Sequence, residues 1–390
     1  MKETTGMEDV MKELAQAATE RPAELRELKQ KGKKVVPYIG HFIPEELLYA
    51  AGVEPYLICR GGEPEPPEAV LDDMLRFLNP LARSIAGFHM MGLDPVMPLA
   101  DLIVASQPEC HIQRIAELLE HKGLPVFKVG VPPNWDKAYA GEYYFRELEQ
   151  LKAKLEELSG ASISDDTMRE YIGYTNEVHG VLRNIDELRK TESPPLGGYD
   201  FIHLNHHSFY VEPRLAAEKL GQVLAMLEAA PGKFPKDAPR ILLAGHAVAV
   251  GDYLVVKNLE DSGALIATEM LDEGIQWYRW DTAIEGDPLR NLWRAKYLDK
   301  VPVNIFQPAW RDRFEHMRML IDEYRIDGVV WYQLAYDEIY DMECTVIAKW
   351  LRELKVPLLK LETSYEYSRE ATGPLNTKIE SFVESLRRGR

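Results

Sequence analysis

Short apolar segments alternate with amphipathic stretches in two separate blocks of this chain, and this alternation constrains the fold more than any other sequence feature. Strands that alternate with helices form parallel sheets with helices on both faces. Two such blocks predict an α/β protein with two doubly wound parallel-sheet domains. The apolar segments lie at residues 33–38, 53–59, 101–106 and 124–129 in the first block, and at 240–246, 264–269, 327–336 and 356–361 in the second.

A highly charged stretch separates the two blocks. Between residues 142 and 190 the apolar residues recur at helical spacing, which predicts helices, and the sequence PPLGG at 194–198 breaks this run. A chain of 390 residues also exceeds what one ordinary hydrophobic core holds. We therefore expect a helical lead-in at 1–32, a first α/β domain at 33–141, a helical middle region at 142–236 and a second α/β domain at 237–390.

The charge balance limits the partners of the protein. The chain has 63 acidic and 46 basic residues and a formal net charge of -17. Nucleic-acid binding needs a positive surface that displaces counterions, so the charge argues against nucleic acid and against an anionic membrane surface. No apolar run reaches the roughly 18 residues of a membrane-spanning helix, and the N-terminus lacks the apolar centre of a signal peptide. We expect a cytoplasmic protein.

The three cysteines lie far apart and form no C-x-x-C pair, so no disulfide framework is expected. Cys110 follows a predicted strand at a helix N-terminus, where backbone N–H groups lower the pKa of a thiol and favour the thiolate that binds metals. A free, buried thiol is an equal alternative. Cys344 shares an apolar helical stripe with Ile347 and Leu351, which indicates core packing. Cys59 ends a strand and either borders a site or fills space.

Polar residues at the ends of strands indicate where a ligand binds. Asp337 follows the segment at 327–336, and Gly245 and His246 end the segment at 240–246. Open α/β sheets bind ligands beyond the carboxyl ends of their strands. Asp337 is alternatively a cap for the helix that follows it. Asn79, directly before a proline, is predicted to be the N-cap of a helix.

The histidine cluster gives only a weak signal, and two nucleotide-binding motifs are absent from the sequence. His203, His206 and His207 lack the spacing typical of zinc ligands, so a surface or interdomain cluster is favoured. The chain has neither the G-x-G-x-x-G fingerprint of dinucleotide binding nor the G-x-x-x-x-G-K-[ST] loop of an ATPase.

Six segments, taken in order, resemble the 2-hydroxyacyl-CoA dehydratase and benzoyl-CoA reductase family over most of the chain. No one of them is diagnostic, but their order makes the resemblance strong. They are VVPYIGHFIPEELLYAAGVEPYLI, NPLARSIAG, ADLIVASQPEC, RILLAGH with LEDSGALIATE, DGVVWYQLAYDE, and TGPLNTKIESF.

This resemblance implies two flavodoxin-like domains in each subunit and a related sister subunit. It also implies a [4Fe–4S] cluster that three cysteines hold between the domains. A separate ATP-dependent iron–sulfur activator protein would deliver one electron at very low potential. That electron makes a ketyl-type radical of an acyl-CoA thioester, which allows loss of the 2-hydroxyl group, or ring reduction in the benzoyl-CoA branch.

The resemblance also implies candidate site residues. Tyr38, His41 and Glu46 correspond to positions that border the thioester in the family, and we expect them on the substrate side. Glu46 is alternatively a first-turn acid that the helix dipole stabilises. Cofactor contacts are expected from Asn79 and Ser84, because in the family the corresponding segment begins with the first cluster cysteine. They are also expected from Gly245 and His246.

The chain departs from the family pattern at the cluster ligands. Asn79 stands at the first cysteine position and Asp337 at the third, and only Cys110 matches, with an offset of one residue. Carboxylate is a hard ligand, whereas iron–sulfur clusters are normally held by thiolates.

Several explanations of this departure stay open. The chain is a cluster-lacking structural or acyl-CoA-binding partner of a cluster-bearing sister, or it holds a cluster through Cys110 and Asp337 with His111 or Cys59. Alternatively it retains only ligand binding, or binds zinc or ferrous iron through Cys110, Asp337 and a histidine.

Overall fold

Two four-stranded parallel sheets organise the protein, which a computed structural model describes over residues 6–74, 76–306 and 309–389. The strand order of the first sheet is β2-β1-β3-β4, the arrangement of flavodoxin-like domains. Every neighbouring pair is parallel, with Tyr38 opposite Val104 in the β1–β3 pair. The strands are β1 (Val35–Ile39), β2 (Glu54–Leu57), β3 (Ile103–Gln107) and β4 (Val126–Gly130).

The second sheet repeats this arrangement in the order β6-β5-β7-β8. All residues of β5, β6 and β7 are buried, because helices cover both faces of a parallel sheet. The predicted α/β fold class is therefore confirmed. The strands are β5 (Arg240–Gly245), β6 (Leu265–Met270), β7 (Gly328–Leu334) and β8 (Leu358–Thr363).

Helices flank each sheet. The helix after β3 begins at Cys110, so this cysteine lies at a helix N-terminus, as predicted. The first domain contains α2 (Glu45–Ala50), α3 (Glu65–Ala69), α4 (Pro80–Met90), η1 (Met97–Leu99) and α5 (Cys110–His121), and the second contains α10 (Leu254–Asp261), α12 (Trp310–Glu323), α13 (Glu338–Glu353) and α14 (Arg369–Arg388).

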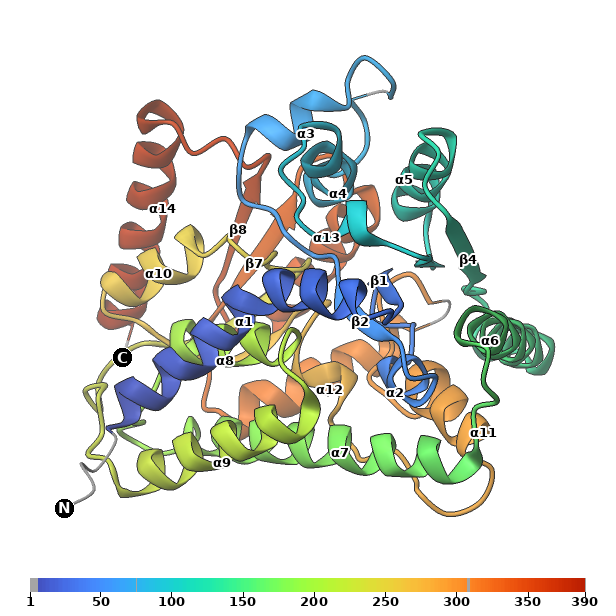
Figure 1. Ribbon diagram of the computed structural model, residues 1–390. Helices are drawn as coiled ribbons and strands as arrows, with labels where there is room; N and C mark the ends of the chain where they lie inside the picture. Colours follow the sequence, from blue (N-terminus) through green and yellow to red (C-terminus); the bar gives the residue numbers. More distant parts are fainter. Residues whose placement is uncertain (1–5, 75, 307–308, 390) are drawn as a thin grey trace.

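The helices α6 to α9 connect the two domains, and the N-terminal helix α1 packs against α8 and α9. In Figure 1, α7 and α9 lie along the lower side of the molecule, and α1 crosses in front of the sheets. The buried side chains of α1 recur every three or four residues, from Val10 through Leu14 and Ala18 to Leu25, so one face of this helix packs on the protein. These helices are α1 (Met7–Gln30), α6 (Ala138–Ser159), α7 (Asp165–Leu188), α8 (Gly198–Ser208) and α9 (Pro213–Ala229).

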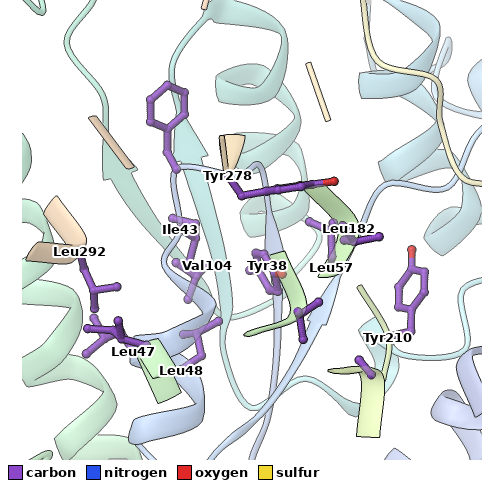
Figure 2. Packing of buried hydrophobic residues seen from close by; sticks show 14 of the residues in the cluster. Tyr38, Ile43, Leu47, Leu48, Leu57, Val104, Leu182, Tyr210, Tyr278 and Leu292 are labelled. Atoms are coloured by element: carbon purple, nitrogen blue, oxygen red, sulfur yellow. The ribbon is translucent and has the colours of Figure 1, made fainter. Parts of the chain in front are cut away.

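The largest hydrophobic cluster joins the first sheet to these connecting helices. Figure 2 shows Tyr38, Leu57 and Val104 from the strands near Leu182 of α7 and Tyr278 from the segment after β6. The first domain and the helical middle region therefore share one core. No helix in the described parts of the chain is both long and apolar enough to cross a bilayer.

The segment between β6 and α12 has little regular structure. It contains the short helices η2 (Ile275–Trp277), α11 (Pro288–Trp293) and η3 (Arg294–Leu298), of which η3 is a π-helix. Short π-helices are rare and frequently lie at functional sites. The helix α12 follows this segment and leads to β7.

Candidate functional site

The carboxyl-terminal edges of both sheets border one cavity. In each sheet the strand order reverses between two central strands, β1 and β3 in the first and β5 and β7 in the second. Ligands bind at such switch points in open α/β sheets. The residues that follow all four strands line a single cavity of about 950 Å³ of empty space, counted out to its open mouth: Gly40 and His41 after β1, Glu109 after β3, His246 after β5, and Asp337 after β7.

Two glycines let the chain leave its strands at this edge. Gly40 has a φ of +86°, and a Cβ atom there would lie 2.2 Å from the Ser106 Oγ. Gly245 has a φ of +123°, and its Cβ would lie 2.0 Å from the backbone oxygen of Tyr332. Only glycine fits both the backbone conformation and the space. Gly245 therefore shapes the turn that carries His246 to the cavity, and it does not itself line it.

Asp337 is the polar centre of the cavity and connects the domains. It is 5% exposed, and its Oδ2 lies 3.0 Å from the Asn79 Nδ2 and 3.2 Å from the His246 Nε2. Burial acts to raise the pKa of this carboxyl group, but the hydrogen bonds and the histidine charges outweigh it, so the pKa is lowered. The pKa of His246 is raised, because Asp337 outweighs the effect of burial. Asp337 occupies the N-cap position of α13, but its side chain makes no capping bond to that helix and instead contacts Asn79 and His246.

Asn79 is the N-cap of α4, as predicted. Its Oδ1 accepts a hydrogen bond of 2.8 Å from the backbone N–H of Ala82, while its Nδ2 donates to Asp337. Its backbone N–H donates to the His111 Nδ1 at 3.0 Å. Both polar atoms of the side chain already take part in hydrogen bonds within the protein, so a cofactor would have to compete with these bonds.

Cys110 differs from the expectation of a low thiol pKa. It is the first residue of α5 and is exposed, yet its pKa is raised, first by partial burial and then by the negative charges of Glu109, Glu338 and Asp337. These carboxylates outweigh the favourable helix terminus. The prediction of a thiolate at this position was wrong.

Glu109, Cys110 and His111 place their potential ligand atoms within 4.8 Å of one another. The hydrogen bonds argue against a metal site there. The Glu109 carboxylate already accepts from the backbone N–H groups of His111 and Ile112. The His111 Nδ1 lone pair already accepts from the backbone N–H of Asn79, so this atom is not free to bind a metal.

The described residues do not fit a [4Fe–4S] cluster held by three thiolates. The three expected ligand positions are occupied by Asn79, Asp337 and Cys110. The Asn79 amide and the Asp337 carboxylate are hydrogen-bonded to each other, and the pKa of the Cys110 thiol is raised. Cys59 lines the cavity, but burial raises the pKa of its thiol to about 12, and its Sγ lies 3.4 Å from the Tyr210 hydroxyl. Cys344 is buried in the core, as predicted.

The three residues expected on the substrate side, Tyr38, His41 and Glu46, do not all line the same cavity. His41 lines the cavity, and burial, with help from Lys296 and Lys300, lowers its pKa to about 3, so the ring is uncharged. Tyr38 instead lines a smaller neighbouring cavity that His41 also borders.

The acid of the opening helix that reaches a cavity is Glu45, not Glu46. Glu45 lies 3.0 Å from the Tyr38 hydroxyl in the smaller cavity, and burial raises its pKa to about 7. Glu46 is 1% exposed and its Oε1 lies 3.5 Å from the Lys296 Nζ. It lines neither of these cavities, because α2 directs it into the protein. Ser84 is likewise fully buried within α4, away from the cavity lining.

Sequence analysis missed the residues that the segment after β6 contributes. Glu273 accepts a bond of 2.7 Å at Oε1 from the Val248 N–H, and burial raises its pKa well above the ordinary value. Asn304 and Trp277 also line the cavity. These residues follow no periodic pattern. The available signal was the length of the irregular stretch, since long loops on α/β scaffolds are usually functional.

The histidines of α8 form an interdomain cluster, in line with one of the two predicted locations. His206 is 1% exposed, and its Nδ1 lies 2.9 Å from the hydroxyl of Tyr253. The His203 ring lies on the same tyrosine, 3.9 Å between ring centres. Within the described residues these histidines do not meet the geometry of a metal site.

Comparisons with known proteins agree on one family. Residues 41–386 match the family model described as 2-hydroxyglutaryl-CoA dehydratase, D-component. The Escherichia coli (strain K12) protein YjiM, a putative dehydratase subunit, is 26% identical, over 92% of this chain and 93% of its own. One of the benzoyl-CoA reductase subunits of Thauera aromatica is 24% identical over 91% of each chain. The beta subunit of the Acidaminococcus fermentans (R)-2-hydroxyglutaryl-CoA dehydratase is 23% identical, over 93% of this chain and 95% of its own.

Proposed function

Because the chain belongs to the family of the 2-hydroxyglutaryl-CoA dehydratase D-component, we propose that it is part of a multi-protein enzyme that acts on an acyl-CoA or aryl-CoA thioester by one-electron chemistry. In this proposal the chain supplies a cavity for the acyl group and lacks a cluster of its own. A related sister subunit holds the [4Fe–4S] cluster, and an ATP-dependent iron–sulfur activator supplies the electron. Two relatives are named as single subunits of a reductase and of a dehydratase, which supports a multi-subunit assembly.

The buried contact of Asp337 with Asn79 and His246 carries this proposal. The resemblance to the family aligns Asn79 and Asp337 with two cluster cysteines. Here the two side chains are hydrogen-bonded to each other, so a cluster would have to break this bond without gaining thiolate ligands. The cavity around them is lined mainly by apolar side chains, which suits ligand binding more than cluster binding.

In this role the chain binds, orients and shields the acyl group. The apolar lining excludes water from the reacting end of the ligand, which strengthens every polar contact made there. His41, uncharged because of its burial, adds no positive charge to the cavity. The residues that line the cavity thus position a substrate, while the electron is transferred at the cluster of the sister protein.

Anoxic purification tests the proposal. A tagged form of the chain, produced with its related sister subunit, is expected to purify as a hetero-oligomer with iron and sulfide for one [4Fe–4S] cluster per pair. The chain produced alone is expected to contain no iron and to give no cluster signal by electron paramagnetic resonance. A stoichiometric oxygen-labile cluster in the isolated chain would overturn the assignment, and so would failure to associate with any sister subunit or CoA thioester.

A matched variant sharpens this test. Cys110→Ala removes the only cysteine that matches the family pattern, and it should leave the iron content and the activity of the complex unchanged. Loss of iron in this variant would show that Cys110 is a cluster ligand. Zinc that persists in aerobically purified protein would instead indicate a metal site of a different kind.

A further inference from the structure

Five side chains that line the cavity have buried polar atoms without a hydrogen-bond partner in the described structure. Two of them, Asp272 and Tyr340, interact electrostatically with each other. The other three supply the Oδ1 of Asp337, the Oε2 of Glu273, and both the oxygen and the nitrogen of the Asn304 amide. The three residues are 5%, 6% and 4% exposed. Buried polar atoms in folded proteins almost always have partners. Three such residues on one cavity indicate a ligand with polar groups that complete them.

The rest of the lining indicates the character of that ligand. Most of the wall is aliphatic or aromatic, with Ile39, Leu57, Ile85, Val303, Ile305 and Trp277 among the contributors. Apolar walls with a few convergent polar groups are typical of pockets that enclose the apolar body of a small molecule and orient it by a few hydrogen bonds.

The charges of the cavity limit the ligand further. No lysine or arginine lines it in the part of the chain that the structure describes, whereas Asp337 and Glu273 do. His246 is already paired with Asp337. Lys300 lies close by, with its Nζ 3.8 Å from the Trp277 ring centre and 4.6 Å from that of Phe42, but it does not line the cavity. A carboxylate in this cavity would therefore be desolvated without a free cationic partner.

We infer that the cavity holds the acyl group of a thioester that is uncharged and apolar except for a hydroxyl group, and that it rejects acyl groups that carry a second carboxylate. The hydroxyl group donates to the Oδ1 of Asp337, and Asn304 and Glu273 provide the further polar contacts. This inference rests on the proposed function, since it assigns the class of acyl group to the same cavity.

A ligand panel tests the inference on the purified full chain. Phenyllactyl-CoA has an apolar body and a hydroxyl group, 3-phenylpropanoyl-CoA lacks the hydroxyl, 2-hydroxyglutaryl-CoA adds a carboxylate, and free CoA is the blank. Calorimetry measures affinity, and the change in total tryptophan fluorescence, to which Trp277 of the cavity wall contributes, reports occupancy. Phenyllactyl-CoA should bind at least about tenfold more tightly than each of the other two thioesters, because each leaves a polar group or a charge unpaired.

Two variants locate the effect. Asp337→Asn keeps the shape and removes the charge, so the discrimination against 2-hydroxyglutaryl-CoA should fall severalfold. Asp341→Asn, on the exposed side of the same helix, should leave every affinity unchanged. Tryptophan fluorescence and circular dichroism of both variants verify that they are folded.

The outcomes separate this inference from the proposed function. If 2-hydroxyglutaryl-CoA binds as tightly as phenyllactyl-CoA or more tightly, the inference is wrong, while the proposed function stands. If no thioester binds to the chain but the chain still assembles with a cluster-bearing sister, the inference is again wrong and the chain is only a structural subunit. If no thioester binds and no sister associates, both proposals are wrong.

Discussion

Asp337 accepts a hydrogen bond from Asn79, a residue 258 positions earlier in the chain, at a distance of 3.0 Å in the buried contact between the two domains. Asp337 lies in the turn between β7 and α13 of the second domain, and Asn79 caps α4 in the first domain. The bond therefore combines two functions, fixing the start of a helix and holding two domains together. A pair of cluster cysteines could not form this bond, because thiols are weak hydrogen-bonding groups.

Replacing Asn79 by alanine should destabilise the protein by about 2–4 kcal/mol. Roughly 1 kcal/mol comes from the lost helix cap, and the rest from an Asp337 carboxylate left buried with one donor fewer. Chemical denaturation of the two proteins measures the difference. Ser164→Ala, which removes the cap of α7 at an exposed position, is the control and should cost only about 1 kcal/mol. Equal effects of the two substitutions would contradict the interdomain role of Asn79.

The pair of His246 and Asp337 should make stability depend on pH. The lowered pKa of Asp337 gives stabilisation that is present above its ordinary pKa of 3.8 and is lost as the pH falls through the lower folded value. The raised pKa of His246 gives stabilisation that is present below its ordinary pKa of 6.5 and is lost as the pH rises through the higher folded value. The stability lost in His246→Gln should therefore be greatest between pH 3.8 and 6.5.

Denaturant titrations of wild type and His246→Gln across this range provide the measurement. We expect a difference of about 1.5–3 kcal/mol within the window, typical of a hydrogen bond to a charged group, and a smaller one at pH 8. A difference that does not change with pH would show that the two side chains interact without charge.

Cys110 should react slowly with iodoacetamide at neutral pH despite its exposure. Its alkylation should follow an apparent pKa above the ordinary 9.0, because partial burial and the neighbouring carboxylates disfavour the thiolate. Glu338→Gln removes one of these charges and should move the midpoint of alkylation to lower pH. Glu353→Gln, at the other end of α13, should leave it in place. A midpoint below 9.0 in the wild type would restore the thiolate prediction.

The central features of this site were predictable because they lie where strand ends and helix starts have sequence signals. Asp337 follows a mainly apolar segment, and Asn79 precedes a proline at a helix start. Both positions are set by local chemistry. The pKa of Cys110 was not predictable, since it depends on Glu338 and Asp337, which only the fold brings near.

Other residues of the site had no sequence signal at all. Glu273 and Asn304 lie in an irregular segment whose path depends on tertiary contacts and not on periodicity. The sequence could not show whether Glu45 or Glu46 reaches a cavity. The two acids are adjacent in the first turn of a helix, and they differ only in the direction in which their side chains point.

Gly40 should tolerate alanine poorly, because two separate constraints act there. Its φ of +86° is unfavourable for alanine, at a cost of about 1–2 kcal/mol. The added Cβ would also lie 2.2 Å from the Ser106 Oγ, an overpacking that costs roughly a further 1–3 kcal/mol. Gly123 has a similar φ of +91° with nothing within 4 Å of the added atom, so Gly123→Ala measures the backbone cost alone.

A double-mutant cycle separates the two costs at Gly40. Ser106→Ala removes the clashing oxygen and also the hydrogen bond of 2.9 Å that this oxygen donates to the Ile39 carbonyl. Since the clash needs both Cβ and Oγ, the double variant should lose less stability than the sum of the two single variants, by about 1–3 kcal/mol. Simple additivity would mean that the turn after β1 relaxes away from β3. The cavity would then widen at this switch point, and thioester binding should weaken in Gly40→Ala but not in Gly123→Ala.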